Sequence, residues 1–99
     1  MPQIMDIINN VCRHYGVKQS EIKRKKRGKY NPALHATCCL LYKHGYNPRV
    51  ITWTVDRSYR QVMRMINRGR ALKKMHGERD VDLRISLSQI NEKINEKAR

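Results

Sequence analysis

The sequence predicts an all-α fold: one domain over residues 1–99, with about six helices that include a helix-turn-helix. Apolar residues recur three and four positions apart along most of the chain, which is the period of helices with one buried face. No segment alternates apolar and polar residues long enough to indicate a strand. The chain has 99 residues, 39% apolar and none of them Phe, so one modest core is expected from Ile, Leu, Val, Met and the single Trp.

The first half of the chain predicts three helices. An amphipathic helix is expected over residues 3–15, with a buried stripe of Ile4, Ile7, Ile8, Val11, Cys12 and Tyr15. A short helix is expected over residues 19–23. Asn31 as N-cap and Pro32 in the first turn open the most apolar segment, which continues to Gly45. This segment is expected to be the central helix of the core, because it is apolar on more than one side.

Residues 47–70 predict a short helix, a tight turn and a longer helix. Asn47 as N-cap and Pro48 at the first position begin the short helix, whose apolar side is expected to hold Val50, Ile51 and Trp53. The longer helix is expected over residues 58–75, with a buried face of Val62, Met65, Ile66, Gly69 and Leu72. Its other faces are basic or amide, which is the pattern of a helix-turn-helix. The alternative is an ordinary helical hairpin with a solvated basic face.

A closing helix is expected over about residues 80–97. Its apolar residues form a narrow seam of Leu83, Leu87, Ile90 and Ile94. This seam would either pack on the protein's own core, in a monomer, or form a homodimer or partner surface. The three cysteines lie in helical patterns and are odd in number, so we expect small reduced core residues at Cys12, Cys38 and Cys39.

Charge indicates the class of partner. The chain has 22 Lys and Arg against 8 Asp and Glu, a net charge of +14, so an anionic partner is expected. Nucleic acid is the first expectation and an anionic membrane surface the second. No stretch reaches the roughly 18 apolar residues that a membrane-spanning helix needs. The first residues lack the pattern of a secretory signal, so a cytoplasmic, nucleoid-associated protein is expected.

A basic segment lies between two predicted helices. Six of the seven residues 23–29 are cationic, and Gly28 is the exception. Because helices on both sides fix its ends, this loop is suited to a phosphate backbone or a minor groove. The alternative is a loop that is only solvated. The predicted DNA contacts here are Arg24, Lys25, Lys26, Arg27 and Lys29.

The order of these elements resembles the C-terminal DNA-binding domain (domain IV) of the bacterial replication initiator DnaA, which has a Trp-repressor-like helix-turn-helix. The resemblance covers about residues 4–95, and its local matches are Ile7, Ile8, Val11, Tyr15 and Val17, the Lys/Arg-rich loop, and residues 50–62. It implies double-stranded DNA binding in the regulation of replication or transcription, with a minor-groove arginine supplied by Arg24 or Arg27. The ATPase module of that family is not expected, because the sequence has no phosphate-binding loop motif.

The residues that read bases in that family are replaced here. The family reads Gly-Gly-Arg-Asp-His, two Ser/Thr and Val across the turn and recognition helix. In this chain residues 55–62 read Val-Asp-Arg-Ser-Tyr-Arg-Gln-Val, so only Arg57 and Val62 match. The Arg-Gln pair that opens the family's central helix is replaced by Ala33 and Leu34. The resemblance therefore implies a relative that binds the family's nine-base box poorly or not at all.

The residue types on the longer helix predict its contacts. Arg60 and Arg64 share one helical face, and each could bond guanine in the major groove. Gln61 would pair with adenine or bond a phosphate, and Tyr59 would touch the DNA backbone or pack against the Trp. Arg57 and the helix N-terminus are expected on phosphates. The remaining predicted DNA-binding residues of this motif are Pro48, Ser58 and Arg68.

Other classes of function are less well supported by the sequence. The four histidines are scattered without the spacing of metal ligands, so neither a metal nor another cofactor is expected. No paired carboxylates indicate acid–base chemistry, and an enzyme is not expected. The alternatives that stay open are a nonspecific RNA or single-strand binder and a protein-interaction adaptor. Most Tyr residues and the Trp are expected on apolar stripes, which counts against single-strand binding.

Overall fold

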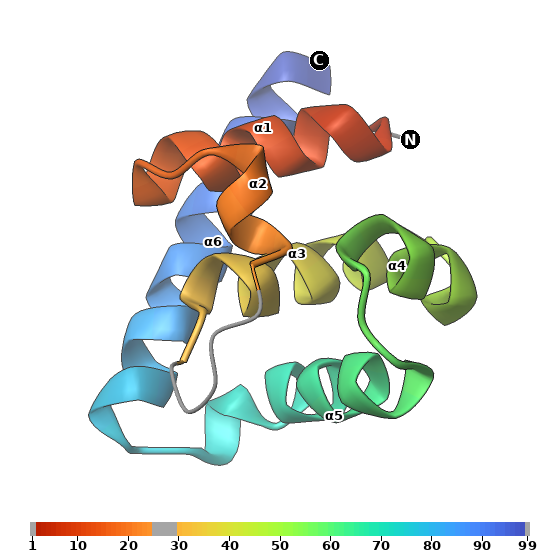
Figure 1. The fold of residues 1–99 in the computed structure, drawn as a ribbon. Helices are drawn as coiled ribbons and strands as arrows, with labels where there is room; N and C mark the ends of the chain where they lie inside the picture. Colours follow the sequence, from red (N-terminus) through yellow and green to blue (C-terminus); the bar gives the residue numbers. More distant parts are fainter. Residues whose placement is uncertain (1, 25–29, 99) are drawn as a thin grey trace.

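The computed structural model describes residues 2–24 and 30–98, and the fold of these residues is entirely helical (Figure 1). Over this part of the chain there are six α-helices, one 3₁₀ helix and no strand, so the all-α prediction is confirmed. The elements in order are α1 (Ile4–Tyr15), α2 (Gln19–Ile22), α3 (Pro32–Lys43), α4 (Pro48–Val55), α5 (Tyr59–Arg70), η1 (Leu72–Lys74) and α6 (Glu78–Ala98).

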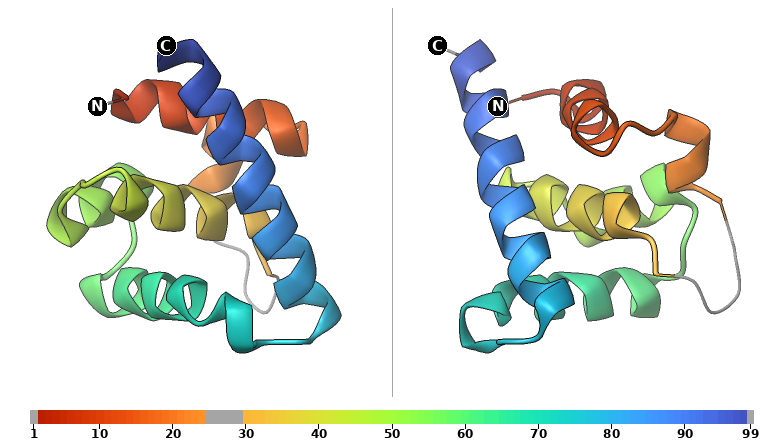
Figure 2. Two further views of the ribbon diagram at one scale, coloured as in Figure 1. Left: turned by 180° about the vertical axis from the view of Figure 1, so that it is seen from behind. Right: turned by 90° about the vertical axis from the view of Figure 1, so that its left-hand side faces the viewer.

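The helices α1, α3 and α5 form three layers with α3 in the middle, and α6 stands upright along one side of all three (Figures 1 and 2). α3 packs against α1, α4, α5 and α6. Buried residues lie around most of its circumference, which confirms that it is the central helix. The apolar seam of α6 faces this same core, since Leu83, Ile90 and Ile94 are all buried there.

The core is aliphatic and contains no aromatic side chain among its fully buried members. The radius of gyration of 12.5 Å is close to the value of about 13 Å expected for a compact domain of this length. Trp53, which the sequence assigned to the core, is instead exposed, and this prediction was wrong. The largest fully buried side chains are Ile7, Leu40, Leu41, Ile51, Ile66, Ile90, Val11, Val55, Val62, Thr37 and Cys38.

Capping side chains fix where α3 and α4 begin. The Asn31 side-chain oxygen accepts a bond of 3.1 Å from the Leu34 N–H, and that of Asn47 accepts one of 2.8 Å from the Arg49 N–H. In both helices proline occupies the first turn, where its missing N–H leaves no bond unmade. The two Asn-Pro pairs therefore set these boundaries as the sequence predicted.

The helix α5 ends at Arg70 rather than continuing to residue 75, so this predicted boundary was wrong. Beyond Arg70 the chain tightens, because the Ala71 N–H bonds both the Arg68 carbonyl at 3.1 Å and the Asn67 carbonyl at 3.2 Å. The 3₁₀ turn η1 then brings Leu72 into the core, where it is buried. The apolar period continued through Leu72, although the helix itself had ended.

The thiols confirm the expectation of small, unpaired cysteines. Cys12, Cys38 and Cys39 are all free, and Cys38 is fully buried. Burial raises the pKa of both Cys38 and Cys39 to about 12, because the interior disfavours a thiolate. These two thiols therefore remain protonated and unreactive at neutral pH.

A close approach joins α3 to α5 at Gly69. The Met65 carbonyl on α5 accepts hydrogen bonds from His35 Nε2 at 2.9 Å and from the Cys39 thiol at 3.6 Å. One turn later, a Cβ added at Gly69 would lie 2.4 Å from Cys39 Sγ and 3.5 Å from Cys39 Cβ. The side chain that a larger residue would meet here is the Cys39 sulfur, so Gly69 leaves room for that thiol.

We expect Gly69→Ala to lower the free energy of unfolding by about 1–2 kcal/mol, because the overlap with Cys39 Sγ costs more than the gain in helix propensity. In a Cys39→Ala background the sulfur is absent, and the same substitution should instead raise stability by about 0.5–1 kcal/mol. Urea unfolding of the four proteins measures this cycle. An equal loss in both backgrounds would show that the contact with sulfur is not the cause.

A short polar chain runs from the exposed Tyr30 to the buried His35 beside this contact. His35 is buried, and the Met65 carbonyl fixes its tautomer by accepting from Nε2. Nδ1 is then the acceptor for the Tyr30 hydroxyl at 3.4 Å. Burial lowers the pKa of His35, with the Arg68 charge acting in the same direction, and burial raises the pKa of Tyr30 to about 12. Both groups are therefore neutral in the folded protein at pH 7.

Because the pKa of His35 is lower in the folded than in the unfolded chain, its contribution to stability is complete above about pH 6.5. It is lost progressively as the pH falls below that value, where the unfolded chain binds the proton first. We expect the midpoint of thermal unfolding to fall between pH 7 and pH 5, and to fall less in His35→Gln. The exposed His14 serves as control, and an unchanged profile in His35→Gln would contradict the assignment.

Candidate nucleic-acid interface

The start of α5 is stabilised by two reciprocal hydrogen bonds from backbone N–H groups to side-chain oxygens. The Ser58 hydroxyl oxygen accepts from the Gln61 N–H at 3.2 Å, and the Gln61 side-chain oxygen accepts from the Ser58 N–H at 3.2 Å. This capping box follows from Ser at the N-cap and Gln three positions later. Both residues were predicted as DNA contacts, and both side chains here stabilise the leading end of the helix. The amide NH₂ group of Gln61 is the part that this arrangement leaves for another partner.

Three residues join α4 to α5, and the first of them has unusual backbone geometry. Asp56 ends α4 with φ of 54° and ψ of 53°, in the left-handed region that glycine favours. Asp tolerates this region better than most residues do. The Arg57 N–H then returns to the Thr52 carbonyl at 3.3 Å. The turn is therefore tight, and α4 and α5 pack directly against one another.

Arg57 links this turn to the basic segment. Its guanidinium donates from Nη1 to the Lys23 carbonyl at 3.0 Å and from Nη2 to the Arg24 carbonyl at 2.9 Å. It was predicted to contact phosphate, but these bonds give it a structural role. They hold Lys23 and Arg24, both exposed, beside the turn that precedes α5. The other predicted contacts of the segment, Lys25, Lys26, Arg27 and Lys29, lie outside the described residues.

The outward face of α5 presents two arginines one turn apart. Arg60 and Arg64 are exposed, whereas Val62 and Ile66 on the opposite face are buried. Within residues 2–24 and 30–98, neither guanidinium has a hydrogen bond or an ion pair. Asn67, also exposed, continues this face by one further turn. The donors of both arginines are therefore available to an external acceptor.

Arg68, which was predicted to contact DNA, forms an ion pair within the fold. Its guanidinium forms a two-pronged ion pair with Asp80, with Nε to Oδ1 at 3.0 Å and Nη2 to Oδ2 at 3.0 Å. The Asp80 side chain is only 10% exposed, and that of Arg68 is 48% exposed. This pair ties the end of α5 to the first turn of α6. We therefore assign Arg68 to the fold rather than to the candidate interface.

Two exposed aromatic residues, Trp53 and Tyr59, flank the same surface. The exposure of Trp53 was not predicted from the sequence. Trp53 is 78% exposed and Tyr59 is 54% exposed. Both line a hollow of about 250 Å³ together with Arg49 and Thr52. Two roles were expected for Tyr59: packing against the Trp or touching DNA. In the structure Tyr59 lines the same hollow as Trp53. Predicted Pro48 lies half-buried in the first turn of α4, next to Arg49.

A signal for the exposure of Trp53 was present in the sequence. Ile51 and Val55 are four apart and define the buried side of α4. Each residue of an α-helix advances by about 100°, so position 53 lies about 200° from position 51. Trp53 therefore lies on the side of α4 opposite to Ile51 and Val55, although all three residues are apolar.

The charge around this surface is almost entirely of one sign. Between Ile22 and Gly77 the sequence has a single acidic residue, Asp56. The remaining carboxylates lie on α1, on α2 or from Glu78 onward. Most of the positive charge therefore lies in the part of the chain between Ile22 and Gly77, which includes α3, α4, α5 and η1, and this favours a polyanion as partner.

The described part of the chain has neither a cluster of metal ligands nor a membrane-spanning helix. No group of three or more His, Cys, Asp or Glu residues is placed to hold a metal ion there. None of the helices described is both long enough and apolar enough to cross a membrane. In comparisons with protein-family models, curated proteins and solved structures, nothing matches this chain.

Proposed function

We propose that the chain binds double-stranded DNA through α4 and α5, which act as a helix-turn-helix with α5 in the major groove. The observation that carries this proposal is the pair Arg60 and Arg64, exposed and without partners in the described part of the chain, beside a turn to which Arg57 ties Lys23 and Arg24. The guanidinium group is the commonest side-chain partner of guanine O6 and N7. A DNA backbone beside the helix would be met by Lys23, Arg24 and Arg49.

The order of helices also supports a proposed relationship with the DnaA C-terminal domain. α1, the short α2, the basic segment, the central α3 and the α4–α5 pair follow the sequence of elements that the resemblance implies. Under this proposal the protein acts at the nucleoid in the regulation of replication or transcription, and it is not an enzyme. Its DNA site differs from the nine-base box, because Ser58, Tyr59, Arg60 and Gln61 replace the family's reading residues.

Selection from random duplexes at about 150 mM salt tests the proposal, because affinity for DNA is interpretable only at a stated salt concentration. Enrichment of one motif is the expected result. If about six to eight phosphates are neutralised, log K should fall against log salt with a slope of about −5 to −7. Absence of duplex binding at any salt concentration would overturn the proposal.

A single-strand binder is the second candidate, and the exposed Trp53 and Tyr59 favour it. Aromatic side chains that stack on bases contribute about 1–3 kcal/mol per base. Trp53 is the only Trp in the chain, so its fluorescence reports directly on this surface. Titration with a single strand and with a duplex of equal length distinguishes the two candidates. Tighter single-strand binding that is lost in Trp53→Ala would favour the second.

A further inference from the structure

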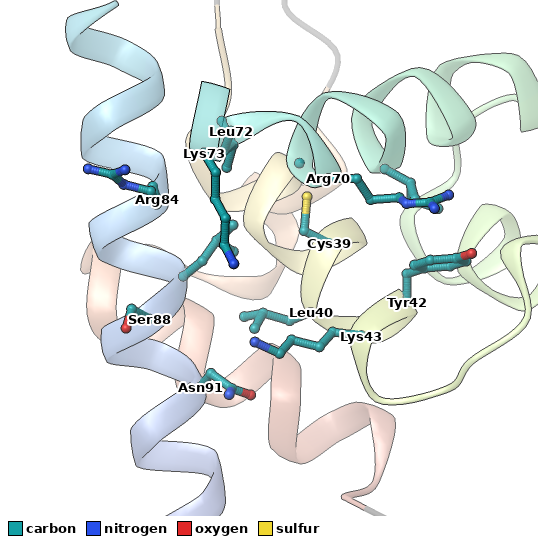
Figure 3. A pocket seen from close by; sticks show the side chains of 13 residues that line it. Cys39, Leu40, Tyr42, Lys43, Arg70, Leu72, Lys73, Arg84, Ser88 and Asn91 are labelled. Carbon is teal, nitrogen blue, oxygen red and sulfur yellow. The ribbon is translucent and has the colours of Figure 1, made fainter. Parts of the chain in front are cut away.

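A pocket of about 550 Å³ opens on a part of the molecule that the proposed function does not use. It lies between α3, the end of α5 with η1, and α6 (Figure 3). The buried side chains of Leu40, Ile66 and Leu72 form its floor, and the half-buried Leu87 borders it from α6. Both the volume and the apolar floor are typical of sites that take small organic molecules.

The rim of this pocket is cationic. Four different elements contribute one basic side chain each, and no carboxylate is among the lining residues that the structure describes. Figure 3 shows Lys43 from α3 and Lys73 from η1 extending their ammonium groups toward the same space beside α6. Arg84 points to the outer side of α6, and Arg70 lies toward Tyr42. The charge that faces the pocket therefore comes chiefly from the two lysines.

These cations differ from Arg68, which is close to them in the chain but is neutralised by Asp80. Among the described residues, Lys43 and Lys73 have no ion pair, so their like charges repel one another across the opening. An anion bound between them would remove this repulsion and gain two charge-assisted hydrogen bonds. An apolar group attached to that anion would also cover the half-buried Leu87, above the already buried Leu40, Ile66 and Leu72.

We infer that this pocket binds a small organic anion that has an aromatic or branched aliphatic body. The body packs against Leu87 above the buried floor, and the carboxylate, sulfonate or phosphate group lies between Lys43 and Lys73. A simple inorganic anion would leave Leu87 partly exposed, and a neutral apolar molecule would leave the lysines unpaired. The site therefore selects for the two properties together.

Three probes separate these contributions. Anilinonaphthalene sulfonate has both the apolar body and the charge, phenylnaphthylamine has the same body without the charge, and inorganic sulfate has the charge alone. We expect saturable binding of the first with one site per chain, and at least about tenfold weaker binding of the other two. Backbone amide NMR shifts should map this site to Gly69, Ser88 and Asn91. Equal binding of the neutral probe, or shifts confined to the Trp53–Tyr59 hollow, would overturn the inference.

Matched variants complete the test without DNA, so its result does not depend on the proposed function. Lys43→Gln/Lys73→Gln should weaken the sulfonate probe at least about tenfold. Lys18→Gln/Lys93→Gln removes the same charge from exposed lysines that do not line the pocket, and it should change binding little. Ser88→Phe keeps every charge and fills the space, so it should also abolish binding. Equal losses in both lysine pairs would overturn the inference.

A DNA backbone is the alternative binding partner of Lys43 and Lys73. If Lys43→Gln/Lys73→Gln weakens duplex binding as strongly as removal of Arg60 and Arg64 does, the two lysines belong to the DNA surface. That outcome would overturn the inference of a separate organic-anion site.

Discussion

Replacing both Arg60 and Arg64 by Ala should weaken binding to the selected duplex by roughly 30- to 20,000-fold. Each bidentate contact between Arg and guanine contributes about 1–3 kcal/mol of discrimination, and the two arginines are one turn apart on the exposed face of α5. Fold stability should be nearly unchanged, because neither guanidinium bonds another described residue. Fluorescence anisotropy with labelled duplexes measures the loss, and circular dichroism confirms folding.

The control for charge alone is Arg13→Ala/Lys18→Ala, which removes two exposed cations from a distant part of the chain. It should lower the affinity for every duplex slightly and equally. The single variant Arg60→Ala should lose about 1–3 kcal/mol on the selected site and almost nothing on unrelated sequences. An equal loss on all sequences would show that Arg60 contacts only phosphates.

Arg68→Ala should lower the stability of the fold and change DNA affinity little, which is the reverse of the result expected for Arg60 and Arg64. We expect it to lower the free energy of unfolding by about 2–4 kcal/mol, because Asp80 would remain buried without its cation. Its effect on DNA affinity should not exceed that of Arg13→Ala, since its guanidinium is committed to Asp80. Chemical denaturation measures the first quantity, and anisotropy at a temperature where the variant is folded measures the second.

Two further variants test the geometry of this ion pair. Arg68→Lys should recover only part of the stability, because an ammonium group cannot make the two parallel bonds of a guanidinium. Arg64→Ala, on the same helix, should stay within about 0.5 kcal/mol of the natural chain. If Arg64→Ala and Arg68→Ala were equally destabilising, loss of the ion pair with Asp80 would not be the cause of the lower stability of Arg68→Ala.

Local signals were sufficient to predict most of the helices. Capping residues such as Asn31 and Asn47 act within three residues of their own position, so their effect can be read directly from the sequence. The central position of α3 followed from its apolar composition. The end of α5 could not be predicted in this way, because the period that Leu72 continues is common to an α-helix and to the tighter turn that replaced it.

The candidate site was predictable only in part, for a related reason. The exposed arginines of α5 follow from helical periodicity, which depends on neighbours three and four positions away. Arg57 bonds a residue 34 positions away, and Arg68 bonds a residue 12 positions away. No local sequence pattern distinguishes these two arginines from arginines without a partner. Four basic residues of the 23–29 segment lie outside the described residues, so their predicted contact with DNA stays a prediction.

The upright position of α6 has a consequence for how the chain folds during synthesis. Ile90 and Ile94 complete a core whose other side is formed by Ile7 and Val11, 79 to 87 positions earlier. Contacts between the ends of a chain are slow to form, because a long loop must close before they contribute. While the ribosome still holds the last helix, α1 and α3 would expose apolar surface. The nascent protein should therefore acquire its native resistance to proteolysis only after α6 has been released.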